Sequence, residues 1–197
     1  MLHVGLALPQ AIRELDGFIL DALVACIGEC VPYAHNLGAG DQITGGSESS
    51  EGEGPCHVHC SARGKYLFTS NYNSGSIAAF PLGTDGTIGP DSCVVQSSGT
   101  GPVESRQEGP HTHFVSLDPD ESYLLSPDLG SDKILVYSFD HDSGLLVPNP
   151  EQEFLKLDPG SGPRHLVFHP NGKHIYVVNE LNSTVTACRF DKKKGTL

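Results

Sequence analysis

Histidine and arginine side chains follow three Gly-Pro pairs in this sequence. The three segments are Gly54–His57, Gly109–His113 and Gly162–His165. A histidine with its ordinary pKa near 6.5 can accept or donate a proton at neutral pH. Arginine presents a fixed fork of N–H donors that suits a carboxylate, a phosphate or a developing oxyanion. Brought together at one place, these side chains could bind an anion and move protons.

The elements that must position these residues form a repeat. The Gly-Pro pairs stand 55 and then 53 residues apart, and each pair is followed by an apolar run, a turn, a second run, a further turn and a third run. The second runs are 66–71, 123–128 and 174–179, and the third runs are 76–82, 133–139 and 184–190. A fixed period of this size with several short strands per unit is typical of β-propeller blades.

The repeats define the expected domain organisation. They cover residues 54–108, 109–161 and 162–197 within a propeller region of 51–197, with fourth strands expected at 92–97 and 153–157. Residues 1–50 do not resemble the repeats. There, apolar residues at steps of three and four between Ile12 and Cys26 predict a short N-terminal helix, and a Gly/Ser-rich linker follows.

The third repeat stops after three strands, so the sequence predicts an all-β propeller of which about three to four blades are present. Closed propellers have about four to eight blades. A blade cannot bury both of its faces alone, and open strand edges favour aggregation. We therefore expect the chain to be part of a longer propeller. The alternative is self-association through the open blade edges.

Composition excludes several classes of partner. The formal net charge of −12 argues against nucleic-acid binding by a basic surface. No apolar run approaches the length of a membrane span, and no signal peptide is recognised, so neither membrane nor secretion is expected. The six cysteines follow no framework spacing, which favours a reduced, cytoplasmic setting.

Alignment of the repeats from their inner turns (Gly64, Glu121 and Gly172) shows which positions differ. Cys56, His113 and Arg164 fall at one place, with two extra residues in the middle copy. The repeats differ at this position, and two of them have a His or an Arg there. Because the position is expected near the propeller axis, this difference favours a functional site at the axis. The second runs all end in a polar residue, namely Asn71, Asp128 and Asn179. Such side chains commonly bond their own turn backbone, and the alternative is contact with a substrate.

Longer motifs carry a family resemblance. They are Asn71–Ser76, Arg106–His113, Asp128–Asp132 and Gly160–Glu180. In these segments, which lie within about residues 50–197, the chain resembles the lactonase family of seven-bladed β-propellers. That family includes the propeller type of 6-phosphogluconolactonase and the fungal carboxymuconate lactonizing enzymes. The resemblance implies a propeller of well over 300 residues.

The resemblance also implies a site in the central cleft. Its members would be His111 or His113, Arg164 and Glu180, together with a basic residue from a later blade that lies beyond Leu197. Lactone opening needs a base for water and donors for the oxyanion, roles that fit His and Arg. Glu180 could orient Arg164 or a histidine, or act as the base. Four further residues are candidates for substrate contact: Arg106, Gln107, Asn71 and Asp128.

The leading hypothesis is hydrolysis of a sugar lactone, most plausibly 6-phosphogluconolactone, within the pentose phosphate pathway. A carboxymuconate-type cyclisation and an inactive partial propeller acting as an interaction surface are the alternatives. No cofactor is expected. The segment Cys56–Cys60 invites a zinc interpretation, but alternation along a strand places its cysteines and histidines on opposite faces. We therefore expect no metal site.

Overall fold

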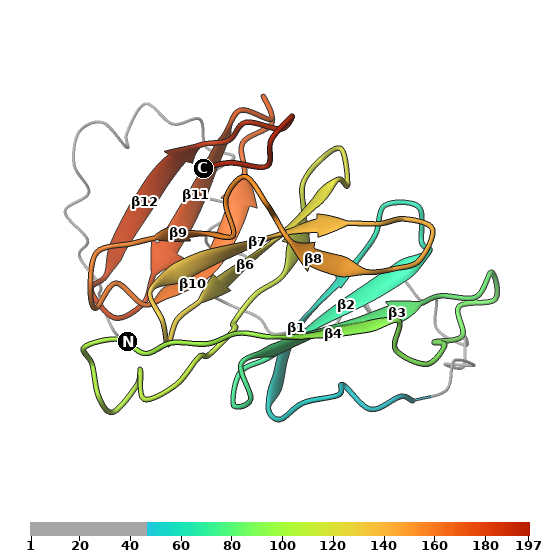
Figure 1. The fold of residues 1–197 in the computed structure, drawn as a ribbon, viewed down its shortest axis with the longest axis horizontal. Coiled ribbons are helices and arrows are strands. Elements are labelled where there is room, and N and C mark those ends of the chain that lie inside the picture. Colours follow the sequence, from blue (N-terminus) through green and yellow to red (C-terminus); the bar gives the residue numbers. More distant parts are fainter. Residues whose placement is uncertain (1–46) are drawn as a thin grey trace, which may run out of the picture.

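Three antiparallel sheets make up the computed structural model, which describes residues 47–197 (Figure 1). All regular elements of this part are β-strands, as the repeat pattern predicts. Residues 47–197 contain no helix of the length and apolarity that crossing a membrane requires. The N-terminal helix predicted between Ile12 and Cys26 lies outside the described residues.

The first sheet has the order β1-β2-β3-β4. Its strands are β1 (Pro55–Cys60), β2 (Tyr66–Asn71), β3 (Ser76–Pro81) and β4 (Cys93–Gln96). The third sheet has the order β10-β11-β12, with β10 (Pro163–Phe168), β11 (His174–Asn179) and β12 (Thr184–Arg189). Each predicted run in these two sheets therefore forms a strand, and each sheet is one blade.

The middle sheet is less regular. Its strands are β5 (Ser116–Leu117), β6 (Tyr123–Asp128), β7 (Lys133–Phe139), β8 (Leu146–Pro148) and β9 (Phe154–Lys156). Both β8 and β9 pair with β7, each along one half of its length. The sequence pattern predicts β9 as the fourth strand, and it misses β8, which is only three residues long. The two extra residues in this repeat shorten the inner strand β5 to two residues.

Turn geometry confirms the alignment of the repeats. The inner turns contain Gly64, Glu121 and Gly172, whose φ angles are 63°, 55° and 64°. A non-glycine residue rarely adopts this left-handed conformation. Its presence at Glu121, in register with two glycines, shows that the turn geometry is imposed by the blade.

Two apolar cores lie between the blades, one on each face of the middle sheet. Leu124, Leu135 and Tyr137 face the first blade, whereas Leu125, Ile134 and Val136 face the third. Successive strand residues point to opposite faces, so β6 and β7 supply both cores by alternation. This explains why their apolar runs are nearly continuous. The middle blade is thus sandwiched, as a propeller requires.

The outer blades keep one face uncovered within the described residues. Val58 and Val94 of the first blade are 43% and 44% exposed, and Val185 of the third is 38% exposed. The middle blade also has exposed apolar side chains at its outer strands, with Val147 54% and Phe154 40% exposed, so the need of the outer blades for neighbours stays a prediction.

The inner strands converge on a common axis. His57 of β1 and His165 of β10 belong to blades that are not adjacent, yet their ring centroids are 6.3 Å apart. Radial stacking brings the beginnings of β5 and β10 close to this axis. The side chains that precede or begin these strands therefore meet although they are far apart in sequence.

Candidate active site

Backbone register aligns three residues at the start of the inner strands. Pro55 pairs with Asn71, Thr112 forms a bridge with Asp128, and Pro163 pairs with Asn179. The next residues are Cys56, His113 and Arg164, which are the three that the repeat alignment singles out. In β1 and β10 the register shifts at this point, between Pro55 and His57 and between Pro163 and His165. A bulge of this kind re-aims a side chain, and here it sets the direction of Arg164.

Glu180 joins two arginines across the site. Its Oε1 accepts a hydrogen bond from Nη2 of Arg106 at 2.7 Å, and its Oε2 accepts one from Nη1 of Arg164. The arginine side chains are 42% and 40% exposed, whereas Glu180 is 24% exposed. Each guanidinium group thus has one edge fixed by the carboxylate and a part that faces solvent. Two half-exposed cations held at a fixed separation form a site suited to an anion.

The neighbouring arginines favour the ionised form of Glu180. Burial opposes ionisation of Glu180, but the hydrogen bonds and charges of Arg106 and Arg164 outweigh burial and lower its pKa. Hydrogen bonds to Tyr72 and Glu180 raise the pKa of Arg106. Because both carboxylate oxygens are engaged, Glu180 is arranged to orient the arginines and is poorly placed to take a proton.

His113 lies next to the arginines. Burial first, and then the charge of Arg164, lower the pKa of His113. Its Nδ1 is buried without a hydrogen-bond partner in the described part of the chain. Its ring meets that of His165 edge-on, with centroids 5.1 Å apart. The lowered pKa favours the neutral form of His113, and its ring lies beside two cations.

His111 is held from three sides. Its Nδ1 lies 2.9 Å from the carbonyl oxygen of Tyr72, and its Nε2 lies 3.2 Å from a carboxylate oxygen of Glu108. Its ring stacks on that of Tyr72 at 4.4 Å and 11°. Both polar partners are acceptors, so the two hydrogen bonds form together only when both ring nitrogens carry a proton. Of the two candidate histidines, His113 has a ring nitrogen without a hydrogen-bond partner in the described residues, whereas both ring nitrogens of His111 have one.

Asp128 does not reach the site surface. It is fully buried, and its two oxygens accept five hydrogen bonds. The donors are the backbone N–H groups of His111, Gly130 and Ser131 and the hydroxyls of Ser97 and Ser131. Asn71 is likewise fully buried, and its Nδ2 donates to the carbonyl of Ser50 and to Ser76. Neither side chain is accessible in this geometry, so the structure gives no support to the substrate contacts predicted for Asp128 and Asn71.

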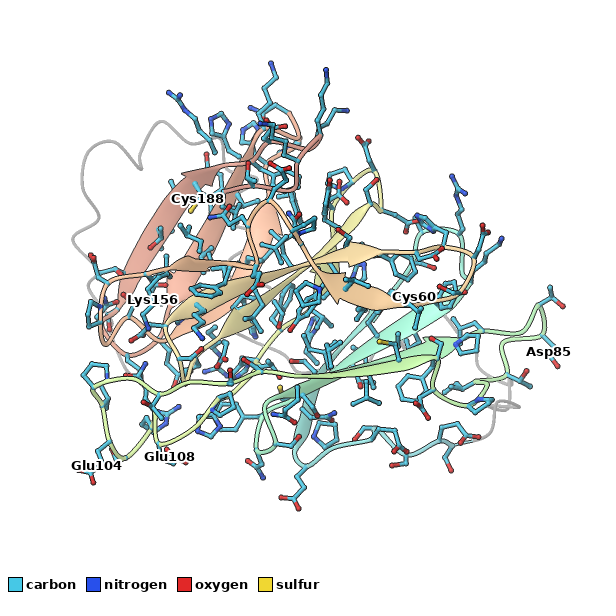
Figure 2. The ribbon with its side chains drawn as sticks, viewed as in Figure 1. Cys60, Asp85, Glu104, Glu108, Lys156 and Cys188 are labelled. Carbon is cyan, nitrogen blue, oxygen red and sulfur yellow. The ribbon has the colours of Figure 1, made fainter. Side chains whose placement is uncertain are left out.

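Gln107 is also fully buried, so this geometry gives no support to its predicted substrate contact either. Its Oε1 accepts from the N–H of Val103, and its Nε2 donates to the carbonyl of Leu129 and to Asp132. These bonds tie the loop between β4 and β5 to the middle blade. Gln107 thereby fixes the position of its neighbour Arg106. In Figure 2 the labelled Glu104 and Glu108 mark this loop, at the end of the molecule opposite to Asp85.

Two residues that matter for this geometry were not predicted. Asp132 is fully buried, adopts a φ of 53° and accepts from the N–H groups of Gly160 and Gly162, which lead into Arg164. Tyr72 contacts both histidines and Arg106. A signal for Tyr72 exists in the repeats, since it immediately follows Asn71 as Glu180 follows Asn179. The equivalent residue of the middle blade is the buried Leu129.

A cavity of about 780 Å³ lies elsewhere, at the opposite ends of the strands. It is lined by residues 118–120, 171–174 and 189–193. Asp118 there accepts hydrogen bonds from the backbone of its own turn, and Lys192 pairs with Asp120 at 2.9 Å. The cavity contains neither His113 nor Arg164, the two residues that the repeat alignment marks, so we place the candidate site at Arg106, Glu180 and Arg164. Among residues 47–197, no three His, Cys, Asp or Glu side chains gather so that they could hold a metal ion.

Comparison with known proteins gives a consistent result. The family model described as a lactonase seven-bladed β-propeller matches residues 33–197. A 6-phosphogluconolactonase of Bacillus subtilis is 37% identical over 145 residues, which cover 74% of this chain and 40% of the relative. A 6-phosphogluconolactonase of Formosa agariphila is 31% identical over 169 residues, which cover 86% of this chain and 48% of that relative. The solved structure of a periplasmic gluconolactonase from Pseudomonas aeruginosa matches with a TM-score of 0.64 at 34% identity, over 72% of this chain and 40% of that one. The chain thus spans less than half the length of these relatives.

Proposed function

The chain belongs to the lactonase family of seven-bladed β-propellers, and from this premise we propose that it serves in the hydrolysis of a sugar lactone, with 6-phosphogluconolactone as the leading substrate. The observation that carries the proposal is the placement of His113 beside two arginines that are bridged by Glu180. The names of the relatives from B. subtilis and F. agariphila support the choice of lactone.

In the proposed reaction His113 acts first as a base and then as an acid, and Arg164 stabilises the developing charge. His113 takes a proton from water as its oxygen attacks the lactone carbonyl carbon, which is the task of a general base. Negative charge develops on the carbonyl oxygen, and Arg164 donates to it. The bond from the carbonyl carbon to the ring oxygen then breaks. The ring oxygen leaves as a hydroxyl after it receives the proton held by His113, which returns to its neutral form.

Charge supports a local role for the arginines in binding. A chain with a net charge of −12 repels a phosphorylated sugar at long range. Arg106 and Arg164 oppose this repulsion only at short distance, because their charge is partly neutralised by Glu180. The lowered pKa of His113 keeps it unprotonated in their field, so a cationic pair and a usable base coexist at neutral pH.

The test is lactone hydrolysis by the protein and two variants, followed by acid release and corrected for spontaneous opening. We expect Arg164→Ala to lower kcat/KM by about 100-fold, the effect of losing one oxyanion donor. Arg63→Ala is the matched control, because Arg63 is exposed in the turn between β1 and β2 at the far end of the blade. We expect that variant to match the wild type.

Two outcomes would overturn the proposal. One is unchanged turnover by Arg164→Ala, and the other is the absence of lactone hydrolysis by the wild-type protein. Assays with unphosphorylated gluconolactone and with a carboxymuconate, followed in the cyclising direction, decide between the leading substrate and the alternative reaction. Turnover of the dicarboxylate alone would reassign the site to cyclisation.

A further inference from the structure

Tyr72 is the residue of the first blade that lies within the candidate active site. It is the first residue after β2 and is half-buried. Its ring stacks on His111 at 4.4 Å and meets His113 edge-on at 5.5 Å and 80°. Its hydroxyl accepts a hydrogen bond from Nη2 of Arg106 at 3.3 Å. One side chain from the first blade thus contacts three candidate residues that precede β5.

The place of Tyr72 in its blade matches that of Glu180 in the third blade. Both follow the last residue of the second strand of a blade. Both also accept from the same nitrogen, Nη2 of Arg106, so the guanidinium group is held between the first blade and the third. Equivalent positions of two non-adjacent blades therefore converge on one arginine from the loop between them.

A role in packing alone does not account for Tyr72. Its ring belongs to neither of the two apolar cores. Its contacts are two imidazoles and a guanidinium group, which are polar rings and a cation. No acceptor for the hydroxyl proton of Tyr72 occurs within residues 47–197, so this proton is also open to a ligand oxygen. The side chain is arranged as part of the site surface.

We propose that Tyr72 is a positioning residue of this site, whose ring fixes His111 and His113 and whose hydroxyl fixes Arg106. The proposal rests on the proposed lactone hydrolysis for its kinetic part. The ring and the hydroxyl act on different groups, so their contributions separate by substitution. The hydroxyl governs the placement of a binding arginine, and the ring governs the environment of the base.

The experiment compares Tyr72→Phe, Tyr72→Leu and the wild type by steady-state kinetics and by NMR titration of the histidines. We expect Tyr72→Phe to raise KM about threefold to tenfold with kcat within twofold, because Arg106 loses one of its two acceptors. We expect Tyr72→Leu to lower kcat about tenfold or more. Tyr66→Phe is the matched control in the same blade, since Tyr66 lies in an apolar core away from the site. It should match the wild type.

The NMR titration does not depend on activity. Burial is the main cause of the lowered pKa of His113, so removing the ring of Tyr72 should admit water and move this pKa upward, toward 6.5. The groups that face His113 are the same in the wild type and variants: Arg164, Glu180, Arg106, His57 and His165. Tyr72→Phe keeps the ring and should leave the titration of His113 unchanged.

The results separate the two proposals. A wild type without lactone hydrolysis overturns the proposed function, and the titration of His113 still tests Tyr72. An unchanged His113 titration in Tyr72→Leu overturns the positioning role of the ring. If Tyr72→Leu does not fold, Tyr72→Phe decides the matter, because kinetics equal to those of Tyr66→Phe would overturn the role of the hydroxyl.

Discussion

Lowering the pH should destabilise this fold through His57. The Nδ1 of His57 accepts a hydrogen bond from the backbone N–H of Val115 at 3.3 Å, and its ring packs on Phe114 at 4.0 Å. Burial first, and then the charges of His59 and His113, lower the pKa of His57 to about 4. Protonation of Nδ1 would abolish the bond from Val115. The folded state therefore resists a proton that the unfolded chain takes up readily.

The sign and the size follow from linkage. A folded-state pKa of about 4 against an unfolded value of 6.5 means that the unfolded chain binds more protons in this window. Stability is then intact above pH 6.5 and falls as the pH drops toward 4. Since one pKa unit corresponds to about 1.4 kcal/mol, His57 alone accounts for at most about 3 kcal/mol over the window. Between pH 7 and pH 5 its share is about 2 kcal/mol.

Urea unfolding at pH 7 and pH 5 measures this share when the wild type is compared with His57→Asn. The Asn amide oxygen lies near the place of Nδ1 and can still accept from Val115, but it does not titrate. His59 and His113 are present in both proteins, so the difference between the two losses measures His57 together with its coupling to these two histidines. We expect the variant to lose about 2 kcal/mol less than the wild type on acidification. An equal loss in both proteins would refute the assigned environment of His57.

Three further predictions concern the site and its supports. The acid limb of the pH profile of kcat/KM should have its midpoint below pH 6.5, because burial and the charge of Arg164 lower the pKa of His113. A midpoint above pH 6.5 would contradict the role of His113 as the general base. Asp128→Ala should reduce the free energy of unfolding, measured in urea, by about 3 to 5 kcal/mol, because five hydrogen-bond donors lose their buried carboxylate acceptor. A change below about 1 kcal/mol would be inconsistent with the role of Asp128 as this acceptor. Gly130→Ala should lower the free energy of unfolding by about 1 to 3 kcal/mol in thermal unfolding, because the added Cβ would overlap the carbonyl oxygen of Gly109. Gly109→Ala is the control, because a Cβ there meets no atom nearby and should leave stability unchanged. Equal effects of the two substitutions would argue against the close approach of Gly130 to Gly109.

The blade repeat could be predicted from sequence because it depends on local chemistry. The runs 66–71, 123–128 and 174–179 coincide with β2, β6 and β11, since apolar runs bounded by turn residues have few alternatives. The strand β8 was missed because the repeat pattern expects one fourth strand per blade and β9 already fills that place, whereas in the structure both strands pair with β7. The predicted domain boundary at residue 50 and the cytoplasmic location remain predictions.

Part of the candidate site was also predictable. Repeat alignment marks His113 and Arg164, because a position whose residue differs among otherwise similar blades is not required for the structure that the blades share. The same alignment could not show that Gln107, Asp128 and Asn71 are buried. In sequence, a polar side chain at a strand end looks the same whether it faces solvent or is buried in hydrogen bonds to a neighbouring segment.

The sequence by itself determined the blades, their order and the residue types that begin each inner strand. Only the tertiary structure decided which of these meet. Arg106 and Glu180 are 74 residues apart, and they pair because stacked blades bring the loop before β5 beside the end of β11. Tyr72 joins them from a third segment for the same reason. Local propensity sets the elements, but radial packing of the two apolar cores sets the distances between them.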